Sequence, residues 1–421
     1  MKILMFGWEY PPAITGGLGT ACYGLSQALA PLVEKITFVL PKVKKAVASG
    51  GVELLDASTV RASSIRMEFD DILETIAIDS NLQPYFNEIE YLEQVVPHGR
   101  ERREFVGGAS SQNFSGDYGG DLLAEVSRYS MVAAQIALRD DYDVIHAHDW
   151  MTFPAGIRAQ QMTGIPLVAH VHALEYDRSG EHVNEKIFQI ERLGMEQAQL
   201  VVAVSQRTKE LIIEKYGITA EKIAVLYNGV QALAPHEQVR TEKHLPNPLV
   251  AFLGRMTLQK GPEYFLEAAY LVARKFPDIR FVMAGDGDMF QRMVKRMAEL
   301  RLTKHFHFTG FVNEQKRHQL LSTADLFVMP SVSEPFGISP LEALRHDVPV
   351  IVSKQSGVAE VLHHALKVDF WDVRKTADCI IHILTQKALA RQLIEGSRQD
   401  LSLLNWDRSA SRLLDIYKEL A

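Results

Sequence analysis

The sequence Ser-Val-Ser-Glu-Pro-Phe-Gly-Ile-Ser-Pro-Leu-Glu-Ala-Leu-Arg, residues 331–345, joins a predicted strand to a predicted helix. The apolar run at 326–329 that precedes it is typical of a buried strand. Ser339, Pro340 and Glu342 have the spacing of a capping box, with an N-cap serine, proline at the first helical position and glutamate three residues after the cap. In an open parallel sheet, ligands bind at loops that follow strands in this way.

Two glutamates bracket this loop, and the residues alone leave their roles open. Glu342 can be a capping-box residue that touches no ligand, and Glu334 can be a solvated loop acid. Gly337 lets the backbone approach a ligand closely, and the amides at the helix start suit an anion. The loop is therefore a candidate ligand site beside a purely structural alternative.

Two glutamates eight residues apart around Pro-Phe-Gly-Ile resemble the donor-site signature of retaining GT-B glycosyltransferases of the group 1, family four type. This family contains glycogen synthases and sucrose-phosphate synthases. The resemblance implies that Glu334 lies beside the donor sugar and that Glu342 holds the ribose hydroxyls of the nucleotide. It also places Gly337 and Ile338 in the donor site.

Length and composition indicate a two-domain protein without a nucleic-acid partner. The chain has 421 residues, a formal net charge of −7 and no long basic run. Its two cysteines lie far apart in the sequence, so no disulfide framework is expected. No apolar run approaches the ~18 residues that span a bilayer, and the N-terminal apolar run is too short for a signal peptide. We expect a cytoplasmic protein with no membrane span.

Near the N-terminus, a strand at 3–6 leads into a glycine-rich loop and then a helix, which is the order of elements in many phosphate sites. A dinucleotide fingerprint would need glycine at position 22, where the chain has Cys22. The family resemblance instead places Gly16 and Gly17 against the donor phosphates. Thr15 stands where glycogen synthases of the bacterial starch-synthase type carry lysine. The structural alternative is a tight turn without a ligand.

A strand predicted at 142–145 runs into His-Ala-His-Asp-Trp, residues 146–150. Alternation puts His146 and His148 on one face if the strand continues. Two histidines invite a zinc site, but no further ligand cluster supports one in the sequence, so we predict none. The tract resembles the His-x-His-Asp-Trp tract of glycogen-synthase-like enzymes, which implies that His148 contacts the donor sugar. The alternative is a polar strand end packed against the next helix.

A second charged loop follows the strand predicted at 165–169. It contains His172, Glu175 and Arg178, and the sequence does not decide which of these side chains matters. Residues 42–120 are less regular and carry several aromatic side chains. The family resemblance places this region on the acceptor side.

The second half of the chain begins with a strand predicted at 249–253 and a loop that contains Arg255 and Lys260. An arginine and a lysine at the end of a strand can neutralise a diphosphate, although each alone is most often a solvated charge. Together they resemble the family's Gly-Arg…Lys-Gly diphosphate clamp. The turn at Phe311 and Val312, by the same resemblance, lies beside the nucleotide base.

These observations predict an α/β protein with two Rossmann-like domains facing across a cleft, the GT-B fold. Residues 1–240 form the acceptor-side domain and 249–400 the nucleotide-sugar domain, with a helix at 405–421 crossing back to the first domain.

The predicted function is a retaining hexosyltransferase. It moves a hexose, glucose above all, from ADP- or UDP-glucose to a hydroxyl of a carbohydrate acceptor such as an α-glucan. Two alternatives stay open: a nucleotide-sugar epimerase or phosphorylase on the same fold, and a catalytically silent sugar-binding protein. The nucleotide sugar is a substrate and no cofactor is expected. Because no metal-ligand cluster is visible in the sequence, we expect metal independence.

Overall fold

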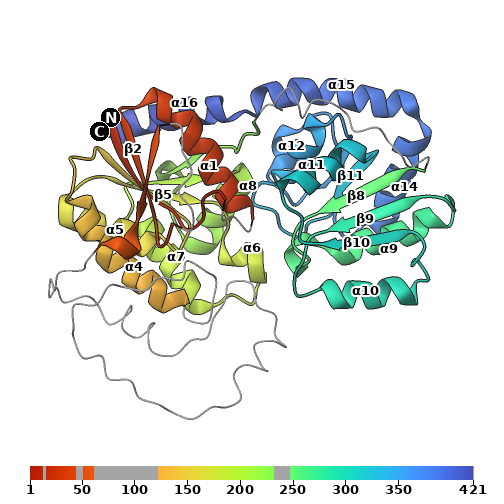
Figure 1. Ribbon diagram of the computed structural model, residues 1–421, viewed down its shortest axis with the longest axis horizontal. Coiled ribbons are helices and arrows are strands. Elements are labelled where there is room, and N and C mark those ends of the chain that lie inside the picture. The colour runs from red at the N-terminus through yellow and green to blue at the C-terminus, as the bar shows by residue number, and fades with distance from the viewer. Residues whose placement is uncertain (13–15, 44–50, 61–121, 232–246, 421) are drawn as a thin grey trace, which may run out of the picture. The chain divides into compact units, whose positions relative to one another are not determined.

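The computed structural model describes residues 1–12, 16–43, 51–60, 122–231 and 247–420. The chain divides into two compact units (Figure 1). Unit 1 comprises Met1–Val204, Thr208–Leu226 and Ser409–Ala421, and unit 2 comprises Ser205–Arg207 and Tyr227–Arg408. Each unit is built on one parallel sheet with helices, which confirms the prediction of two Rossmann-like α/β domains.

The sheet of unit 1 has seven strands in the order β3-β2-β1-β4-β5-β6-β7, and all of its pairs are parallel. Its central strands are buried along almost their whole length, because helices cover both faces. The strand order reverses between β1 and β4, so the loops after these two strands lie at a topological switch point. The strands are β1 (Lys2–Phe6), β2 (Lys35–Leu40), β3 (Val52–Asp56), β4 (Val144–His148), β5 (Leu167–Val171), β6 (Leu200–Ala203) and β7 (Ile223–Val225).

The side chains of β4 point alternately to the two faces of the sheet of unit 1. Ile145 and Ala147 belong to the hydrophobic core with residues of α4 and α5, whereas His146 and His148 point to the opposite face. There Tyr417 of the last helix bonds to His146. The helices are α1 (Gly17–Leu29), α4 (Leu122–Ala137), α5 (Phe153–Thr163), α6 (Glu175–Ser179), α7 (Glu185–Gln197), α8 (Gln206–Leu211) and α16 (Trp406–Leu420), of which α8 and α16 begin in unit 2.

Unit 2 has a six-stranded parallel sheet in the order β10-β9-β8-β11-β12-β13. Here the order reverses between β8 and β11, and these neighbours define its switch point. The strands are β8 (Leu249–Leu253), β9 (Arg280–Ala284), β10 (Phe306–Gly310), β11 (Leu326–Met329), β12 (Val350–Ser353) and β13 (Leu366–Val368).

The helices of unit 2 lie on both faces of its sheet, with α11 and α12 opposite α9 and α10 (Figure 1). Apolar residues of α9, α10 and α14 pack with β8, β9 and β11 into the main core of the unit. The helices are α9 (Pro262–Ala273), α10 (Phe290–Glu299), α11 (Glu314–Thr323), α12 (Ser339–Arg345), α13 (Val358–Val361), α14 (Val373–Thr385) and α15 (Lys387–Leu403).

Candidate active site

Three loops at the carboxyl edge of the unit 2 sheet are joined by backbone hydrogen bonds. Val332, after β11, donates its amide to the carbonyl of Gln259 in the loop after β8, at 2.8 Å. Gly357, after β12, donates to the carbonyl of Glu334 at 3.0 Å. The loops after β8 and β11 therefore form one connected surface at the switch point, where this class of sheet binds ligands.

Glycines allow these loops to approach so closely. Gly261 has a φ of +63°, and a Cβ added there would lie 2.2 Å from the carbonyl oxygen of Pro330. Gly337 has a φ of +105°, and a Cβ added there would lie 3.2 Å from the Glu334 Cγ. A side chain at either position would combine an unfavourable backbone conformation with a tight contact.

The β8 and β11 loops bring two predicted site residues into direct contact. Lys260 Nζ lies 2.6 Å from Glu334 Oε2, and Ser331 Oγ donates to the same oxygen at 3.1 Å. The Glu334 side chain is only 8% exposed, so the ammonium group compensates a carboxylate that is largely removed from water. An ammonium group has three N–H donors. Lys260 can therefore hold Glu334 and an anionic ligand together.

Arg255 lies on the same β8 loop and is half-buried. Backbone bonds fix this loop against the next strand, because Gly254 donates to the carbonyl of Ala284 at 3.0 Å and Met256 to that of Asp286 at 2.9 Å. The two cationic residues predicted from the sequence thus share one loop with a fixed backbone. That arrangement suits binding of a multiply charged anion, because a loop that is already ordered loses less conformational entropy when the anion binds.

The capping-box prediction for Glu342 is wrong. Helix α12 begins one residue earlier than expected, with Ile338 at the N-cap and no side-chain cap hydrogen bond. The amide of Glu342 bonds to the carbonyl of Ile338, so Ser339 already lies inside the first turn. The Glu342 carboxylate instead pairs with Arg317 of α11, with Oε1 3.4 Å from Nη1. Sequence spacing missed this partner because Arg317 belongs to another helix.

The two residues predicted to lie beside the base have different environments. Phe311 follows the edge strand β10 and is one of the most exposed large apolar side chains among the described residues, at 65%. Val312 packs against the small core cluster of Leu249, Val282 and Ala284. Phe311 therefore offers a free aromatic face, whereas Val312 anchors the turn.

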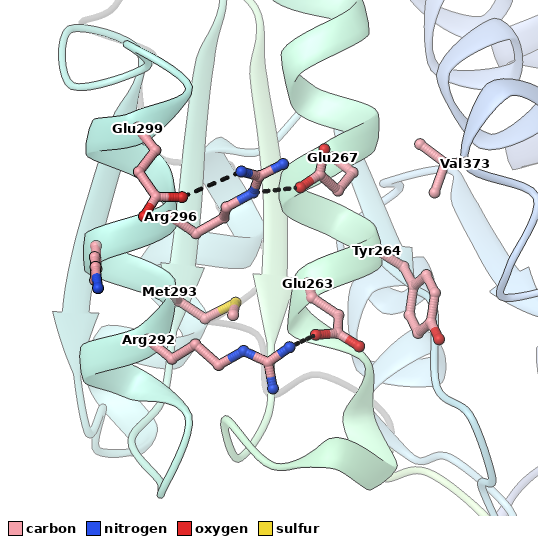
Figure 2. A pocket seen from close by; sticks show the side chains of 9 residues that line it. Glu263, Tyr264, Glu267, Arg292, Met293, Arg296, Glu299 and Val373 are labelled. Carbon is pink, nitrogen blue, oxygen red and sulfur yellow. Dashed lines mark hydrogen bonds and ion pairs between the residues drawn. The ribbon is translucent and has the colours of Figure 1, made fainter.

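A pocket of about 410 Å³ lies between α9 and α10 and contains none of the predicted site residues (Figure 2). Two ion pairs cross it, Arg292–Glu263 and Arg296–Glu267, each with a closest distance of 2.7 Å. These side chains are between 25% and 67% exposed, and such partly solvated pairs contribute little net free energy. We interpret the pocket as a solvated groove between two surface helices.

In unit 1, the predicted phosphate loop leads directly into α1. Gly16 is the N-cap of this helix and Gly17 its first residue, and both are exposed. A Cβ added at either glycine would meet no atom within 4 Å. The first amides of α1 are therefore accessible to an anion. Thr15 lies outside the described residues.

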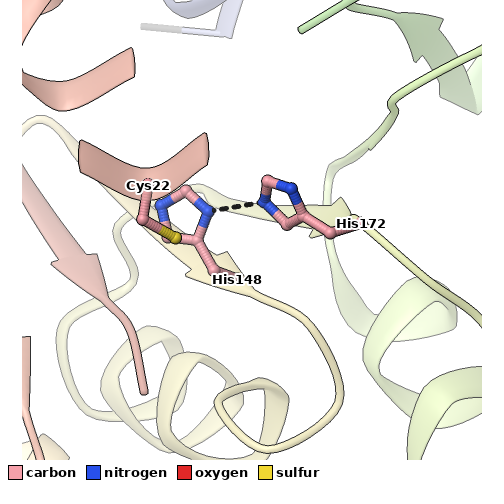
Figure 3. A group of neighbouring side chains, drawn as sticks. All are labelled: Cys22, His148 and His172. Atoms are coloured by element: carbon pink, nitrogen blue, oxygen red, sulfur yellow. Dashed lines mark hydrogen bonds between the residues drawn. The ribbon is translucent and has the colours of Figure 1, made fainter. Parts of the chain in front are cut away.

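His148 lies at the end of β4 and belongs to a cluster of four histidines. His148 Nδ1 is 3.0 Å from His172 Nε2, and His146 Nε2 is 3.1 Å from His170 Nδ1. His170 is the last but one residue of β5, and His172 follows that strand directly. The metal prediction assumed no further ligand beyond His146 and His148, and this premise is wrong. Possible ligand groups are completed by His170 of β5 in one case, and by His172 with Cys22 of α1 in the other (Figure 3).

Burial keeps these imidazoles neutral. It lowers the pKa of His146 and of His172 to about 3, and those of His148 and His170 well below the ordinary value, with smaller contributions from neighbouring histidines for all but His172. Neutral imidazole has one donor and one acceptor nitrogen. Near neutral pH the cluster therefore carries no positive charge. Each imidazole can donate one hydrogen bond and has one nitrogen lone pair that can accept another.

Asp149 fixes the two histidine-bearing segments to each other. It has a φ of +63°, and its Oδ1 accepts the amide of His172 at 2.6 Å and that of Ala173 at 3.3 Å. Burial raises the pKa of Asp149 to about 7, and these two amides act in the opposite direction. Asp149, the acidic residue of the His-Asp-Trp tract, therefore connects the ends of β4 and β5 by hydrogen bonds.

Glu175 and Arg178, whose roles the sequence left undecided, form a buried ion-pair network with Glu191 of α7. Arg178 donates to Glu175 at 3.0 Å and to Glu191 at 2.6 Å, and the Tyr216 hydroxyl donates to Glu191 as well. These charged groups pair with one another inside unit 1. We interpret the network as a structural connection between α6 and α7.

Three neighbours of predicted site residues were not identified from the sequence: His170, His172 and Arg317. A signal for the histidines was present, because His-x-His occurs at the ends of two strands and β4 pairs with β5 so that His148 lies opposite His170. No comparable signal identified Arg317. In the region predicted as the acceptor side, residues 44–50 and 61–120 lie outside the described residues.

Comparison with known proteins identifies the family. Residues 236–400 match the family described as Glycosyl transferases group 1, and residues 98–232 match Glycosyltransferase Family 4. The glycogen synthase of Mycobacterium tuberculosis strain H37Rv is 25% identical over 99% of this chain and 94% of its own length. The chain therefore belongs to the group 1 glycosyltransferases and is an enzyme of that class.

Solved structures show the same fold. Sucrose-phosphate synthase from Thermosynechococcus elongatus matches with a TM-score of 0.73 and 17% identity over 100% of this chain and 98% of that one. Anabaena HepE, solved in complex with UDP and glucose, matches with a TM-score of 0.69 and 18% identity over both whole chains. The protein thus has the two Rossmann-like domains of the GT-B fold. In the described residues, the helices include none with the length and apolarity of a membrane span.

Proposed function

We propose that this glycosyltransferase is a retaining hexosyltransferase that moves glucose from UDP- or ADP-glucose to a hydroxyl of an α-glucan. The observation that carries the proposal is the ion pair between Lys260 and Glu334 at the switch point of unit 2. In this proposal Lys260 is the cation for the leaving diphosphate and Glu334 the carboxylate for the sugar, and their contact supports a shared site. The likeness to a glycogen synthase supports the glucan acceptor, and that to a structure with UDP and glucose supports the donor.

The reaction breaks the bond between the anomeric carbon and the diphosphate oxygen and forms a bond from the same carbon to the acceptor oxygen. Lys260 and Arg255 stabilise the negative charge that grows on the leaving diphosphate, which is the largest catalytic contribution to expect from such a site. Glu334 stabilises the positive charge that develops on the sugar ring. The leaving phosphate takes the acceptor proton, on the face from which it departs.

Other residues of unit 2 bind the nucleotide in this proposal. Glu342, held by Arg317, accepts hydrogen bonds from the ribose hydroxyls, and Phe311 stacks on the base. Gly337 and Ile338 bring backbone amides to the phosphates at the start of α12. The roles of His148 beside the sugar and of Gly16 and Gly17 beside the phosphates stay predictions from the family resemblance.

We also propose that transfer needs no metal ion, because Arg255 and Lys260 supply the positive charge that a metal ion provides in other phosphate chemistry. The protein needs no cofactor beyond its nucleotide-sugar substrate. This assignment is independent of the histidine cluster in unit 1.

One assay tests the proposed function. The purified chain is offered UDP-glucose and ADP-glucose with a malto-oligosaccharide, and both nucleotide release and glucan length are followed. We expect release and elongation to rise together with one of the two donors. Release of nucleotide without elongation, or no consumption of either donor, would contradict the proposal. Epimerisation of the donor without transfer would favour the epimerase alternative.

A further inference from the structure

Three side chains from three separate segments of unit 1 lie next to one another (Figure 3). Cys22 comes from α1, His148 ends β4 and His172 follows β5. One sulfur or nitrogen atom of each lies within 4.8 Å of the others. We propose that Cys22, His148 and His172 form a binding site for a thiophilic divalent cation such as Zn²⁺, which acts as an inhibitor of the enzyme.

The distances fit such an ion. Zinc binds histidine nitrogen at about 2.0–2.1 Å and cysteine sulfur at about 2.3 Å, so two nitrogens on a tetrahedral zinc lie about 3.4 Å apart. His148 Nδ1 and His172 Nε2 are 3.0 Å apart. Small side-chain rotations open this hydrogen bond enough to admit the ion between the two nitrogens.

The donor set also selects the kind of metal. Imidazole and thiolate suit zinc and other late transition metals, whereas magnesium and calcium prefer oxygen ligands. Metal binds to neutral imidazole and to thiolate, so the Cys22 thiol must lose its proton when the ion binds. With three protein ligands, a fourth position stays open for water, as in zinc sites that are not purely structural.

Two other histidine groups are poorer candidates. His146 and His170 also approach His148, but all three are fully buried, and the Tyr417 hydroxyl lies 2.6 Å from His146 Nδ1. In unit 2, His318 and His346 are 3.1 Å apart. Within the described part of the chain, no third histidine, cysteine or carboxylate completes that pair. The Cys22 group combines a thiol with a half-buried histidine, His172, through which an ion can enter.

The consequence for activity rests on the proposed function. If His148 contacts the donor sugar, an ion bound to its Nδ1 fixes the ring and adds positive charge beside the position of the developing oxocarbenium-like centre. Transfer is then inhibited by zinc and restored by a chelator, although the reaction itself needs no metal.

Binding is tested first, without any substrate. The metal-free full chain competes with a chromogenic chelator for Zn²⁺, and the chain offers a matched control because Cys22 and Cys379 are its only cysteines, both buried. We expect one zinc ion per chain for wild type and for Cys379→Ala. Zinc affinity should be lower by at least roughly a hundredfold for Cys22→Ala, because the loss of a direct ligand should cost no less than the ~10–100-fold lost with a group that only supports a ligand. Cobalt substitution gives a thiolate-to-cobalt charge-transfer band in wild type that Cys22→Ala lacks.

Equal zinc affinity of Cys22→Ala and Cys379→Ala, with both folded by thermal melting, would overturn the site and point to another histidine group. His172→Ala is a second variant in case Cys22→Ala does not fold, and it too should lose zinc affinity. In the transfer assay, zinc should inhibit wild type and Cys379→Ala but spare Cys22→Ala. Zinc binding through Cys22 without inhibition would overturn the inhibitory role, and absence of any transfer activity would contradict the proposed function while the binding result stands.

Discussion

Lys260 and Glu334 form an ion pair of 2.6 Å although 74 residues separate them in the sequence. The contact exists because β8 and β11 are neighbours in the sheet, so the loops that follow them meet at the switch point. It joins the two halves of the expected chemistry, the cation for a leaving diphosphate and the carboxylate for a sugar.

Removing either cation of the β8 loop should slow transfer. Arg255→Ala and Lys260→Ala each remove positive charge from the leaving diphosphate, and the loss of one such group lowers turnover on the order of a hundredfold or more. Lys304→Ala is the matched control, because Lys304 is exposed and precedes the amino end of β10, away from the carboxyl edge. Steady-state kinetics with the preferred donor measures the effect. Near wild-type turnover in both folded loop variants would contradict the assignment of this loop.

Glu342→Gln should weaken nucleotide binding without lowering stability. Its carboxylate makes no cap hydrogen bond, and its partly exposed pair with Arg317 is worth about 0–1 kcal/mol. A hydrogen bond to a charged group contributes ~1.5–3 kcal/mol, so affinity should fall by roughly tenfold or more.

Arg317→Gln provides a companion measurement, because it leaves the carboxylate in place and removes its partner. We expect a smaller loss of nucleotide affinity than in Glu342→Gln, measured by calorimetry, and nearly wild-type melting temperatures for both variants. A lowered melting temperature with unchanged affinity in Glu342→Gln would show that the residue only supports α12.

The buried histidines should make the protein less stable in acid. The pKa of His146 is about 3 in the folded state and about 6.5 when exposed, so the unfolded chain binds more protons between these values. The contribution of His146 to stability is therefore complete above pH 6.5 and falls as the pH decreases towards 3. Asp149, whose pKa is raised to about 7, has the opposite effect, stabilising the fold as the pH falls below 7.

Comparison of wild type with His146→Gln isolates the contribution of His146 to the loss of stability in acid, because the effect of Asp149 is common to both proteins. Thermal melts at pH 7.5 and pH 5, with EDTA present to exclude bound metal, should show a smaller acid loss in the variant, by on the order of a few degrees. An equal loss in the two proteins would mean that His146 is not held neutral by the fold.

Chelation should not abolish transfer. Because Arg255 and Lys260 neutralise the diphosphate, we expect full activity in excess EDTA, and an increase if the preparation contains zinc. Complete loss of activity that manganese or magnesium restores would refute metal independence.

Apolar runs predicted strands of both sheets, at 3–6 and 142–145 in the first and at 249–253 and 326–329 in the second, but neither β3 nor β13 was predicted. Apolar runs such as 326–329 coincide with buried strands, because a parallel sheet covered on both faces needs continuous apolar segments. Arg255 and Lys260 were placed correctly on one loop after β8, because glycines and a following proline mark that loop locally.

Contacts between distant segments were not predictable from local spacing. Arg317 and Glu342 meet because α11 and α12 are neighbours, and His148 meets His172 because β4 pairs with β5. The predicted cap of α12 was wrong for a local reason: the first turn of a helix also tolerates proline at its second position, so the helix can begin at Ser339 with Ile338 as its N-cap.

The central claim, that the Lys260–Glu334 loops hold the donor diphosphate, is tested most directly by titrating UDP and ADP into wild type, Lys260→Ala and Glu334→Gln. We predict that one nucleotide binds wild type with a stoichiometry of one, and at least about tenfold more weakly to Lys260→Ala, since a charge-assisted contact is lost. Glu334→Gln should bind it as tightly as wild type or more tightly, because a negative charge beside the phosphates is removed. Unchanged affinity in folded Lys260→Ala, or weaker binding in Glu334→Gln alone, would contradict the account.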